Sequence, residues 1–335
     1  MGKTILITGA SGFIGSRLVA ELLKQDCKIY IAARLQSKKT YGDRTNVIYI
    51  PYYPESKTSL LQTFAKLRDD HIHFDYCIHN GGLIKAKNKR EFYDVNFQYT
   101  RNLVESLKES NMVPGVFLYV SSQSAGGPGF KDIPKIEQDV SNPVSHYGKS
   151  KLMAEQFLSS TIDFPFIIVR PCSVYGPGDE NFVNLYEYTE KGIELHFGGK
   201  TKHFSFIHVD DLVLAMIALL ENGENGKVYF ASDGSYYTMD DFFDHVKKAL
   251  GVETKKIHLS KIMAKSIGFM YEIAGLFTRK TSIVNLDKMR EAVQENWLCN
   301  SEQLWEKIGR SPAYTLENGI TGTIEWYLKN KNRGI

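Results

Sequence analysis

Three side chains in the middle of the chain are of types that move protons: Ser122, Tyr147 and Lys151. Tyr147 and Lys151 are four residues apart, so in a helix they lie on the same face. A phenol is a poor base at neutral pH because its unperturbed pKa is about 10, but a nearby ammonium group favours the phenolate. Tyr147 could therefore act as a general acid/base, with Lys151 lowering its pKa and the Ser122 hydroxyl orienting a substrate oxygen. A Y-x-x-x-K pair by itself is more typical of an ordinary helix surface, so the assignment depends on its surroundings.

The N-terminal stretch supplies such surroundings. An apolar run at 4–7 leads into Thr8-Gly9-Ala10-Ser11-Gly12-Phe13-Ile14-Gly15, and apolar residues then recur at helical spacing. A strand, a glycine turn and a helix in this order form a phosphate cradle, because the glycines let the backbone approach a pyrophosphate and the helix N–H groups face the anion. The spacing is G-x-x-G-x-x-G, not the common G-x-G-x-x-G. This context predicts dinucleotide binding through Gly9, Ser11, Gly12, Phe13, Ile14 and Gly15.

The second predicted strand, 27–33, indicates which dinucleotide binds. It ends at Arg34, with Lys38 close behind, and no Asp or Glu occupies the strand end. A carboxylate there binds the 2′-hydroxyl of NAD, whereas an arginine accommodates the 2′-phosphate of NADP. Arg34 and Lys38 therefore favour NADP over NAD. The alternative is a solvated basic loop.

Predicted strands alternate with helices through the first half of the chain. Strands are expected at 46–51, 74–78, 116–120 and 166–170, and helices at 59–67, around 92–107 and at 146–158. This alternation predicts an α/β fold with a Rossmann-type, doubly wound parallel sheet. Ligands of such sheets bind beyond the carboxyl ends of the strands. Gly12, Arg34, Gly81 and Ser122 lie at such ends and should face one crevice, with Asn80 and Gly82 passing close to the cofactor.

The later part of the chain is less regular. We expect a strand at 204–208, a helix at 212–220, a strand at 227–231 and a helix at 239–250. The mostly apolar segment 261–277 is too short and too interrupted for a membrane span and indicates a helix that packs in, or covers, a substrate lobe. His208, Asp210 and Asp211 suggest a metal site at first sight, but helix capping explains the aspartates better because no third ligand has matching spacing. No metal site is predicted.

The totals are those of an ordinary soluble globular protein. The chain has 335 residues, 43% hydrophobic and 24% charged, with a net charge of +3. Such a balance gives no electrostatic case for nucleic acid or for an anionic membrane. The four cysteines are scattered and predict neither a zinc site nor a disulfide framework. The N-terminus is taken up by the first strand, so no signal peptide fits and a cytoplasmic location is the default expectation.

Six motifs in order resemble the extended short-chain dehydrogenase/reductases, also called the NAD-dependent epimerase/dehydratase family. They are TGASGFIG at 8–15, YDVNFQYTRNL at 93–103, YVSS at 119–122, YGKSK at 147–151, RPCSVYGPGD at 170–179 and FIHVDDL at 206–212. By this resemblance, Ser122, Tyr147 and Lys151 match the catalytic triad. Further cofactor contacts are implied at Asn96, Ser121, Tyr147, Lys151, Pro171 and Cys172, and substrate contacts at Ser124, Ser173, Tyr175 and Asn181.

The family pattern also implies a division of the chain and a dimer. Residues 1–174, with 204–234 returning, should form the dinucleotide-binding domain, and residues 175–203 and 235–330 a smaller α/β substrate lobe. A homodimer is what the family suggests. Three departures are informative. Pro51-Tyr52-Tyr53 stands where the family has an acidic adenine contact, Gln123-Ser124 after Ser122 argues against dehydration, and Lys202-His203 replaces an arginine that clamps a diphosphate.

These observations favour an NAD(P)-dependent oxidoreductase that interconverts a secondary alcohol and a ketone. Hydride would pass between the substrate carbon and the nicotinamide, while Tyr147 handles the proton. One alternative is a nucleotide-sugar 4-epimerase with retained NAD, which family frequency favours. Another is a protein that senses NADP without catalysis, which would not need Ser122, Tyr147 and Lys151 together. The partner is a small-molecule substrate in the first two cases, and its identity is not readable from the motifs.

Overall fold

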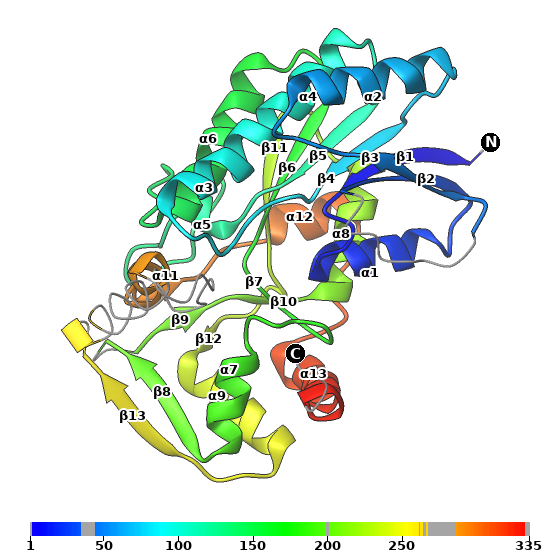
Figure 1. Cartoon of the computed structure of the whole chain (residues 1–335). Coiled ribbons are helices and arrows are strands. Elements are labelled where there is room, and N and C mark those ends of the chain that lie inside the picture. Colours follow the sequence, from blue (N-terminus) through cyan, green and yellow to red (C-terminus); the bar gives the residue numbers. More distant parts are fainter. Residues whose placement is uncertain are drawn as a thin grey trace.

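A parallel sheet of seven strands forms the larger lobe of the protein (Figure 1). The computed structural model describes residues 2–34, 44–198, 201–260, 262–263, 266 and 286–331. The strand order is β11-β6-β5-β4-β1-β2-β3, and all neighbours run parallel. The strands are β1 (Lys3–Thr8), β2 (Cys27–Ala33), β3 (Val47–Pro51), β4 (Tyr76–His79), β5 (Val116–Val120), β6 (Phe166–Pro171) and β11 (Lys227–Ala231).

Helices cover both faces of this sheet, which confirms the doubly wound α/β prediction. Alternate strand residues point to opposite faces, so Ile5 and Ile7 enter one core cluster and Leu6 enters the other. The first cluster is covered by α1 (Phe13–Leu22), α8 (Val209–Asn222) and α12 (Glu302–Ile308). The second is covered by α2 (Lys57–Asp69), α4 (Tyr99–Glu109) and α6 (His146–Thr161).

The strand order reverses between β1 and β4, which are neighbours in the sheet. From β1 the chain proceeds to β2 and β3 on one side, and from β4 to β5 and β6 on the other. In open α/β sheets such a reversal opens a crevice at the carboxyl edge, and ligands bind there. The glycine turn after β1 and the residues after β4 both lie at this edge.

A smaller lobe packs below the carboxyl edge of the sheet in the view of Figure 1. Its core is formed by aromatic and aliphatic side chains of α7 (Val183–Glu190), α9 (Met239–Leu250) and α13 (Leu316–Asn330). Short strand pairs complete it, among them β8 (Ile193–Phe197) with β13 (Lys255–Leu259). Residues 299–308 are not part of this core. They pack in the first core cluster of the large sheet, through Cys299, Leu304 and Ile308.

The strand expected at 204–208 is wrong as one element, because the structure divides it at Ser205. The first part, β9 (His203–Phe204), pairs antiparallel with β12 (Tyr237–Thr238) and parallel with β14 (Asn296–Trp297). The second part, β10 (Phe206–His208), pairs parallel with β7 (Ser173–Tyr175). Ser205 itself donates its N–H to Trp297 and accepts the Cys299 N–H on its hydroxyl. These bonds turn the chain between the two ribbons.

Within the described residues, no helix is both long and apolar enough to cross a membrane. Of the apolar segment 261–277, the described residues include 262, 263 and 266, so the helix expected there lies mostly outside them.

A buried ion pair joins β6 to α6 beneath the carboxyl edge. The Arg170 guanidinium contacts the Glu155 carboxylate at 2.6 Å, and both side chains are 5% exposed. Glu155 also accepts the Ser121 hydroxyl, so one carboxylate joins β6, α6 and the end of β5. Removing either partner of such a pair leaves an uncompensated charge in the core.

We expect Glu155→Ala to lower the free energy of unfolding by about 3–5 kcal/mol, because it leaves the Arg170 guanidinium buried without its carboxylate. Urea unfolding followed by circular dichroism measures the loss. Glu109→Ala is the matched control, since it removes the same side chain from an exposed pair with Lys57, where a loss below about 1 kcal/mol is expected. Equal losses in both variants would contradict the interpretation.

Candidate active site

The glycine turn after β1 holds the backbone closer to its neighbours than a side chain would allow. Gly9 has a φ of 69°, and a Cβ there would lie 2.6 Å from the carbonyl oxygen of Asn80. A Cβ at Gly15 would collide with the Gly9 carbonyl, so α1 begins directly against the turn. The Asn80 amide donates to Gly9 at 3.3 Å, and the Gly81 N–H donates to the Thr8 hydroxyl at 3.0 Å. Together these contacts form a cradle at the N-terminus of α1.

A cavity of about 420 Å³ runs along the carboxyl ends of β1, β2 and β4. Its lining combines the glycine turn with the ends of the neighbouring strands, and includes Gly9, Ser11, Ala33, Arg34, Gly81 and Gly82. A cradle that only glycine fits, opening into a cavity lined by the ends of neighbouring strands, suits a dinucleotide. Arg34 is half-exposed at this cavity and its guanidinium lies 3.7 Å from the Glu55 carboxylate. Lys38 lies outside the described residues.

Tyrosines replace the acidic residue that the family places after the third strand. Tyr52 lines the cavity, together with Tyr49 and Tyr99. Its hydroxyl is buried without a hydrogen-bond partner, and burial raises the pKa of the phenol. Tyr52 therefore presents a neutral aromatic surface to the cavity.

Tyr147 and Ser122 lie at the starts of two helices that meet at the carboxyl edge. Ser122 is the N-cap of α5 (Gln123–Gly126), where its hydroxyl accepts the Ser124 N–H at 3.1 Å. Tyr147 is in the first turn of α6, is 7% exposed, and packs on Phe92 with ring centroids 6.1 Å apart. Burial raises the pKa of Tyr147, while the Lys288 ammonium and a hydrogen bond with Ser122 act in the opposite direction.

Lys151 is buried one helical turn further along α6. Its ammonium donates to the Val120 carbonyl at 2.9 Å and lies 4.9 Å from the centroid of the Tyr119 ring. Burial lowers the pKa of Lys151 to about 8, against the opposing effect of Glu155. A Cβ on Gly82 would lie 2.8 Å from the ammonium nitrogen, so this glycine lets the loop after β4 pass over the lysine.

Asn96 lies in a π-helical turn that interrupts the helix expected around 92–107. The structure divides that helix into α3 (Lys89–Tyr93), the turn η2 (Asp94–Gln98) and α4. The Asn96 side chain accepts the Leu83 N–H at 2.7 Å and donates to the Leu83 carbonyl and the Ser150 hydroxyl at 3.0 Å. It therefore fixes the loop that passes over Lys151. π-turns of this kind are frequent at functional sites.

Several residues predicted to contact the cofactor or the substrate make hydrogen bonds within the protein instead. The Ser121 hydroxyl bonds to Glu155. Tyr175 is fully buried and donates its hydroxyl to the Thr315 carbonyl at 2.8 Å, so the structure does not bring it to the cavity. Asn181 donates to Asp179 through its N–H and its amide. Pro171 ends β6, and the buried Cys172 bonds to Ala231 through its N–H. Ser124 and Ser173 are half-buried near these segments.

Sequence reasoning did not single out His79, which links β1 to the start of α4. Its Nδ1 lies 2.6 Å from the Thr8 hydroxyl and its Nε2 lies 2.9 Å from the Thr100 hydroxyl. Burial, with a smaller effect of the Lys151 charge, lowers the pKa of His79 to about 3, so the ring stays neutral. A histidine at a strand end carries no spacing signal that separates this role from ordinary packing.

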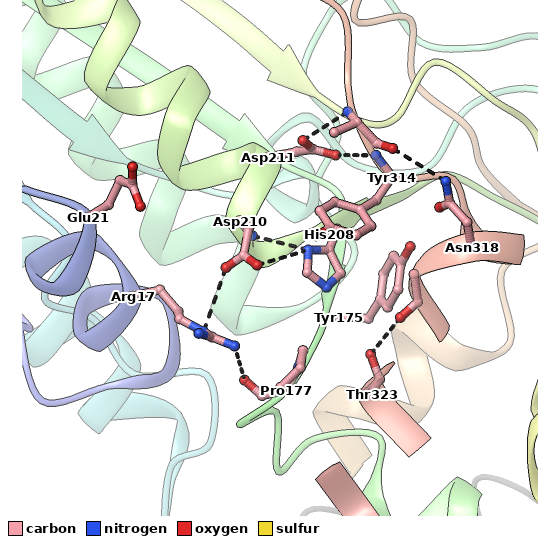
Figure 2. Close-up of polar contacts among 12 residues, drawn as sticks. Arg17, Glu21, Tyr175, Pro177, His208, Asp210, Asp211, Tyr314, Asn318 and Thr323 are labelled. Carbon is pink, nitrogen blue, oxygen red and sulfur yellow. Dashed lines mark hydrogen bonds and ion pairs between the residues drawn. The ribbon is translucent and has the colours of Figure 1, made fainter. Parts of the chain in front are cut away.

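The motif at 206–212 forms a junction with the C-terminal segment, and Figure 2 shows its polar contacts. The Asp211 carboxylate accepts the N–H groups of Ala313 and Tyr314 at 3.0 and 2.9 Å. The Tyr314 ring lies against the His208 imidazole, with centroids 4.1 Å apart. The prediction that both aspartates cap a helix beginning at 212 is therefore wrong. The helix begins at Val209 with His208 as its N-cap, and Asp211 instead fixes the segment that leads into α13.

The same junction holds the loop after β7 over the start of α1. Arg17 of α1 donates to the Pro177 carbonyl at 3.5 Å and pairs with Asp210 at 3.6 Å (Figure 2). The Phe13 ring lies next to Gly178, where a Cβ would be 3.5 Å from it. The cradle is thereby closed from the side of the smaller lobe.

Among the described residues, one group could bring metal-ligand atoms together: Glu194, His196 and Asp240, whose atoms lie within 4.8 Å of one another. Glu194 pairs with Lys247 at 2.9 Å, and Asp240 pairs with Lys256 at 2.8 Å. Because ammonium groups already neutralise both carboxylates, we assign this group to an ion-pair network on the smaller lobe.

Comparison with known proteins agrees with this architecture. The family model described as NAD dependent epimerase/dehydratase family matches residues 5–231. A ceramide reductase of Caulobacter vibrioides is 26% identical over 326 residues, which cover 96% of this chain and 94% of the reductase. A UDP-glucose 4-epimerase of Vibrio cholerae is 26% identical over 341 residues, which cover 99% of this chain and 98% of the epimerase.

A solved structure shows the same fold. The dTDP-glucose 4,6-dehydratase of Bacillus anthracis, in complex with NAD, matches with a TM-score of 0.76 and 22% identity over 99% of this chain and 98% of its own. The fold is thus that of an enzyme with a Rossmann-type domain. The chain belongs to the NAD-dependent epimerase/dehydratase family, that is, to the extended short-chain dehydrogenase/reductases.

We expect Gly9→Ala to weaken the binding of NAD and NADP by about tenfold or more, or 1.4 kcal/mol, because the new Cβ would meet the Asn80 carbonyl at 2.6 Å. Gly251→Ala is a matched control. Its φ is 68°, close to the 69° of Gly9, and a Cβ there meets nothing within 4 Å. That variant should lose about 1–2 kcal/mol of stability and keep its affinity. Thermal unfolding of both variants measures the cost of the left-handed backbone, and calorimetric titration measures the effect of the new Cβ on dinucleotide affinity. Equal dinucleotide affinities in the two variants would contradict the role of Gly9 in the cradle.

Proposed function

We propose that the protein is an NADP-preferring oxidoreductase that interconverts a secondary alcohol and a ketone. The observation that carries the proposal is that Ser122 follows β5, that Tyr147 and Lys151 lie on the first turns of α6, and that the loop after β4 passes over Lys151 at Gly82. A hydroxyl, a phenol and an ammonium group at that edge are what proton transfer to a carbonyl oxygen requires. The similarity to a ceramide reductase supports the reductase assignment.

The roles follow from the chemistry of each group. A nicotinamide dinucleotide, when bound along the cavity, supplies the hydride chemistry. Tyr147 donates a proton to the substrate oxygen during reduction and accepts it during oxidation. Ser122 hydrogen-bonds both the phenol and the substrate oxygen, and so orients the two. Lys151, one turn further along α6, carries a positive charge below its pKa of about 8, and a cation in this region favours the phenolate.

The cofactor preference rests on the end of β2. Arg34 is the one cation among the described residues that line this cavity, and it is half-exposed, so its guanidinium is available to a 2′-phosphate. Glu55, at 3.7 Å from Arg34, is the group that a 2′-phosphate would have to displace or tolerate. The division into a dinucleotide domain and a substrate lobe, and a homodimer, are part of the same proposal.

A nucleotide-sugar 4-epimerase is the second candidate, favoured by the likeness to the Vibrio cholerae enzyme. An epimerase oxidises and re-reduces one carbon, so it retains its dinucleotide between turnovers. Denaturing the purified protein and identifying the released nucleotide separates the two candidates. Retained NAD would support the epimerase and overturn the NADP argument, whereas an empty protein that prefers NADP would support the reductase.

Tyr147→Phe removes the phenolic hydroxyl and little else, so we expect NADPH oxidation with a panel of ketones to slow by about 100-fold or more, with unchanged NADPH affinity. Tyr93→Phe is the control, because it removes a hydroxyl that bonds to His146 at 3.0 Å in the same region. Full turnover by Tyr147→Phe would refute the general acid/base assignment. A protein that binds NADP but turns over none of the ketones, before any substitution, would instead fit the third alternative, a dinucleotide sensor without catalysis.

Arg34→Ala should weaken NADP by about tenfold, or 1.4 kcal/mol, and leave NAD nearly unchanged, because the lost guanidinium pairs with the 2′-phosphate alone. Glu55→Ala should act in the opposite direction, since it removes the carboxylate next to Arg34. Titrating both dinucleotides into both variants gives the four dissociation constants. A parallel loss of NAD and NADP in Arg34→Ala would show that Arg34 does not select between them.

A further inference from the structure

A short helix from the second half of the chain caps the helix that carries Tyr147. This helix, α11 (Leu286–Ala292), places its Asp287 carboxylate on the N–H groups of His146 and Tyr147 at 2.7 and 3.1 Å. One turn later, Glu291 accepts the hydroxyl of Ser145, the N-cap of α6, at 2.6 Å. Two carboxylates at a helix N-terminus match the positive end of its dipole. These bonds fix α11 against the start of α6.

The other side of α11 belongs to the smaller lobe. Met289 and Val293 form a small apolar cluster, against which Phe197 of β8 packs. In Figure 1, α11 is drawn in orange between the lower end of α5 and the strands of the smaller lobe. The helix therefore connects the lobe to the first turn of α6.

Between its two capping carboxylates, α11 carries a lysine that faces Tyr147. The ammonium nitrogen of Lys288 lies 5.1 Å from the centroid of the Tyr147 ring, within the range of a cation–π contact. The same ammonium pairs with Glu291 at 3.0 Å, and the side chain is 33% exposed. The Phe92 ring packs against the same tyrosine. The phenol is thus enclosed between an apolar ring and a cation.

We propose that Lys288 is a positioning residue of the reaction, which holds a positive charge against the Tyr147 ring from the smaller lobe and thereby favours the phenolate. A phenolate ring carries more electron density than a phenol ring, so a cation over its face stabilises the deprotonated form more than the protonated one. The inference rests on the proposed function, because the role of Lys288 is exerted through Tyr147.

Lys288 and Lys151 differ in the pH range over which each keeps its positive charge. The ammonium of Lys151 is bonded to the Val120 carbonyl, and its pKa falls to about 8 because of burial. Desolvation also acts to lower the pKa of Lys288, but the Glu291 carboxylate and Tyr147 outweigh it and the net shift is upward. Lys288 therefore keeps its charge at pH values where Lys151 loses it.

The other groups around the phenol modulate this effect. Glu291 opposes it, because a carboxylate near the phenol raises the pKa of Tyr147. Within the part of the chain that the structure describes, the titratable and charged groups near Tyr147 or Lys288 include Asp287, Lys288 and Glu291 on α11, His146 and Lys151 on α6, Tyr119 on β5, and Lys85 on the loop after β4.

Site-specific 3-fluorotyrosine at position 147 of the full chain reads this coupling directly, because the ¹⁹F shift follows ionisation of that ring and needs no substrate. We expect Lys288→Met to raise the titration midpoint by about one pH unit, and Lys288→Arg to restore it. Glu291→Gln should lower the midpoint, since it removes a negative charge and keeps the acceptor for Ser145. The exposed Lys149 on α6 provides the control, and Lys149→Met should leave the midpoint in place.

An unchanged midpoint in Lys288→Met, or an equal shift in Lys149→Met, would overturn the proposal. If Lys288→Met does not fold, the isosteric Glu291→Gln decides, and a midpoint that fails to fall in that variant refutes the coupling. The proposed function fails by a different result, namely turnover that survives Tyr147→Phe. The two outcomes are therefore distinguishable.

Discussion

The close approach of two backbones at the centre of the sheet is the constraint on which the site depends. Gly9 at the end of β1 touches the carbonyl of Asn80 at the end of β4, and Gly15 lets α1 start against the same turn. A side chain at either glycine would separate the two strand ends. Because β1 and β4 flank the reversal of strand order, that separation would widen the crevice in which the dinucleotide is expected. The buried pair of Arg170 and Glu155 secures the neighbouring edge, from β5 to β6.

Much of this architecture was predictable because its signals are local. Short apolar runs followed by glycine or serine mark the strands and their carboxyl ends, and the predicted bounds of β2, β5 and β11 are those observed. The motif order placed Ser122, Tyr147 and Lys151 in one family and one fold, and the family is confirmed. Local patterns could not show the break at Ser205, because it depends on bonds to residues 297 and 299. Nor could they show the π-turn at Asn96, where the side chain accepts a hydrogen bond from the Leu83 N–H.

The surroundings of the proposed acid/base are the least predictable part of the site. Spacing along α6 predicts that Lys151 lowers the pKa of Tyr147, but it could not show that the same ammonium also bonds to the main chain at Val120. The cation over the phenol ring comes from residue 288, on another helix and in another part of the sequence. Similarly, the sequence predicts that Asp211 caps a helix, whereas its carboxylate accepts the backbone N–H groups of residues 313 and 314. Each of these pairings is long-range, and no pattern within a short window can reveal it.

The return of residues 299–308 to the first core cluster has a consequence for how the molecule is put together. The smaller lobe is not a module appended to one end of a finished domain, because the chain leaves the large sheet, builds part of the lobe, and comes back to contribute Leu304 and Ile308 to the core. The lobe is better described as a set of excursions from one continuous fold. The two lobes therefore share one chain that crosses between them more than once, so replacing a C-terminal segment would change part of the sheet core together with part of the smaller lobe.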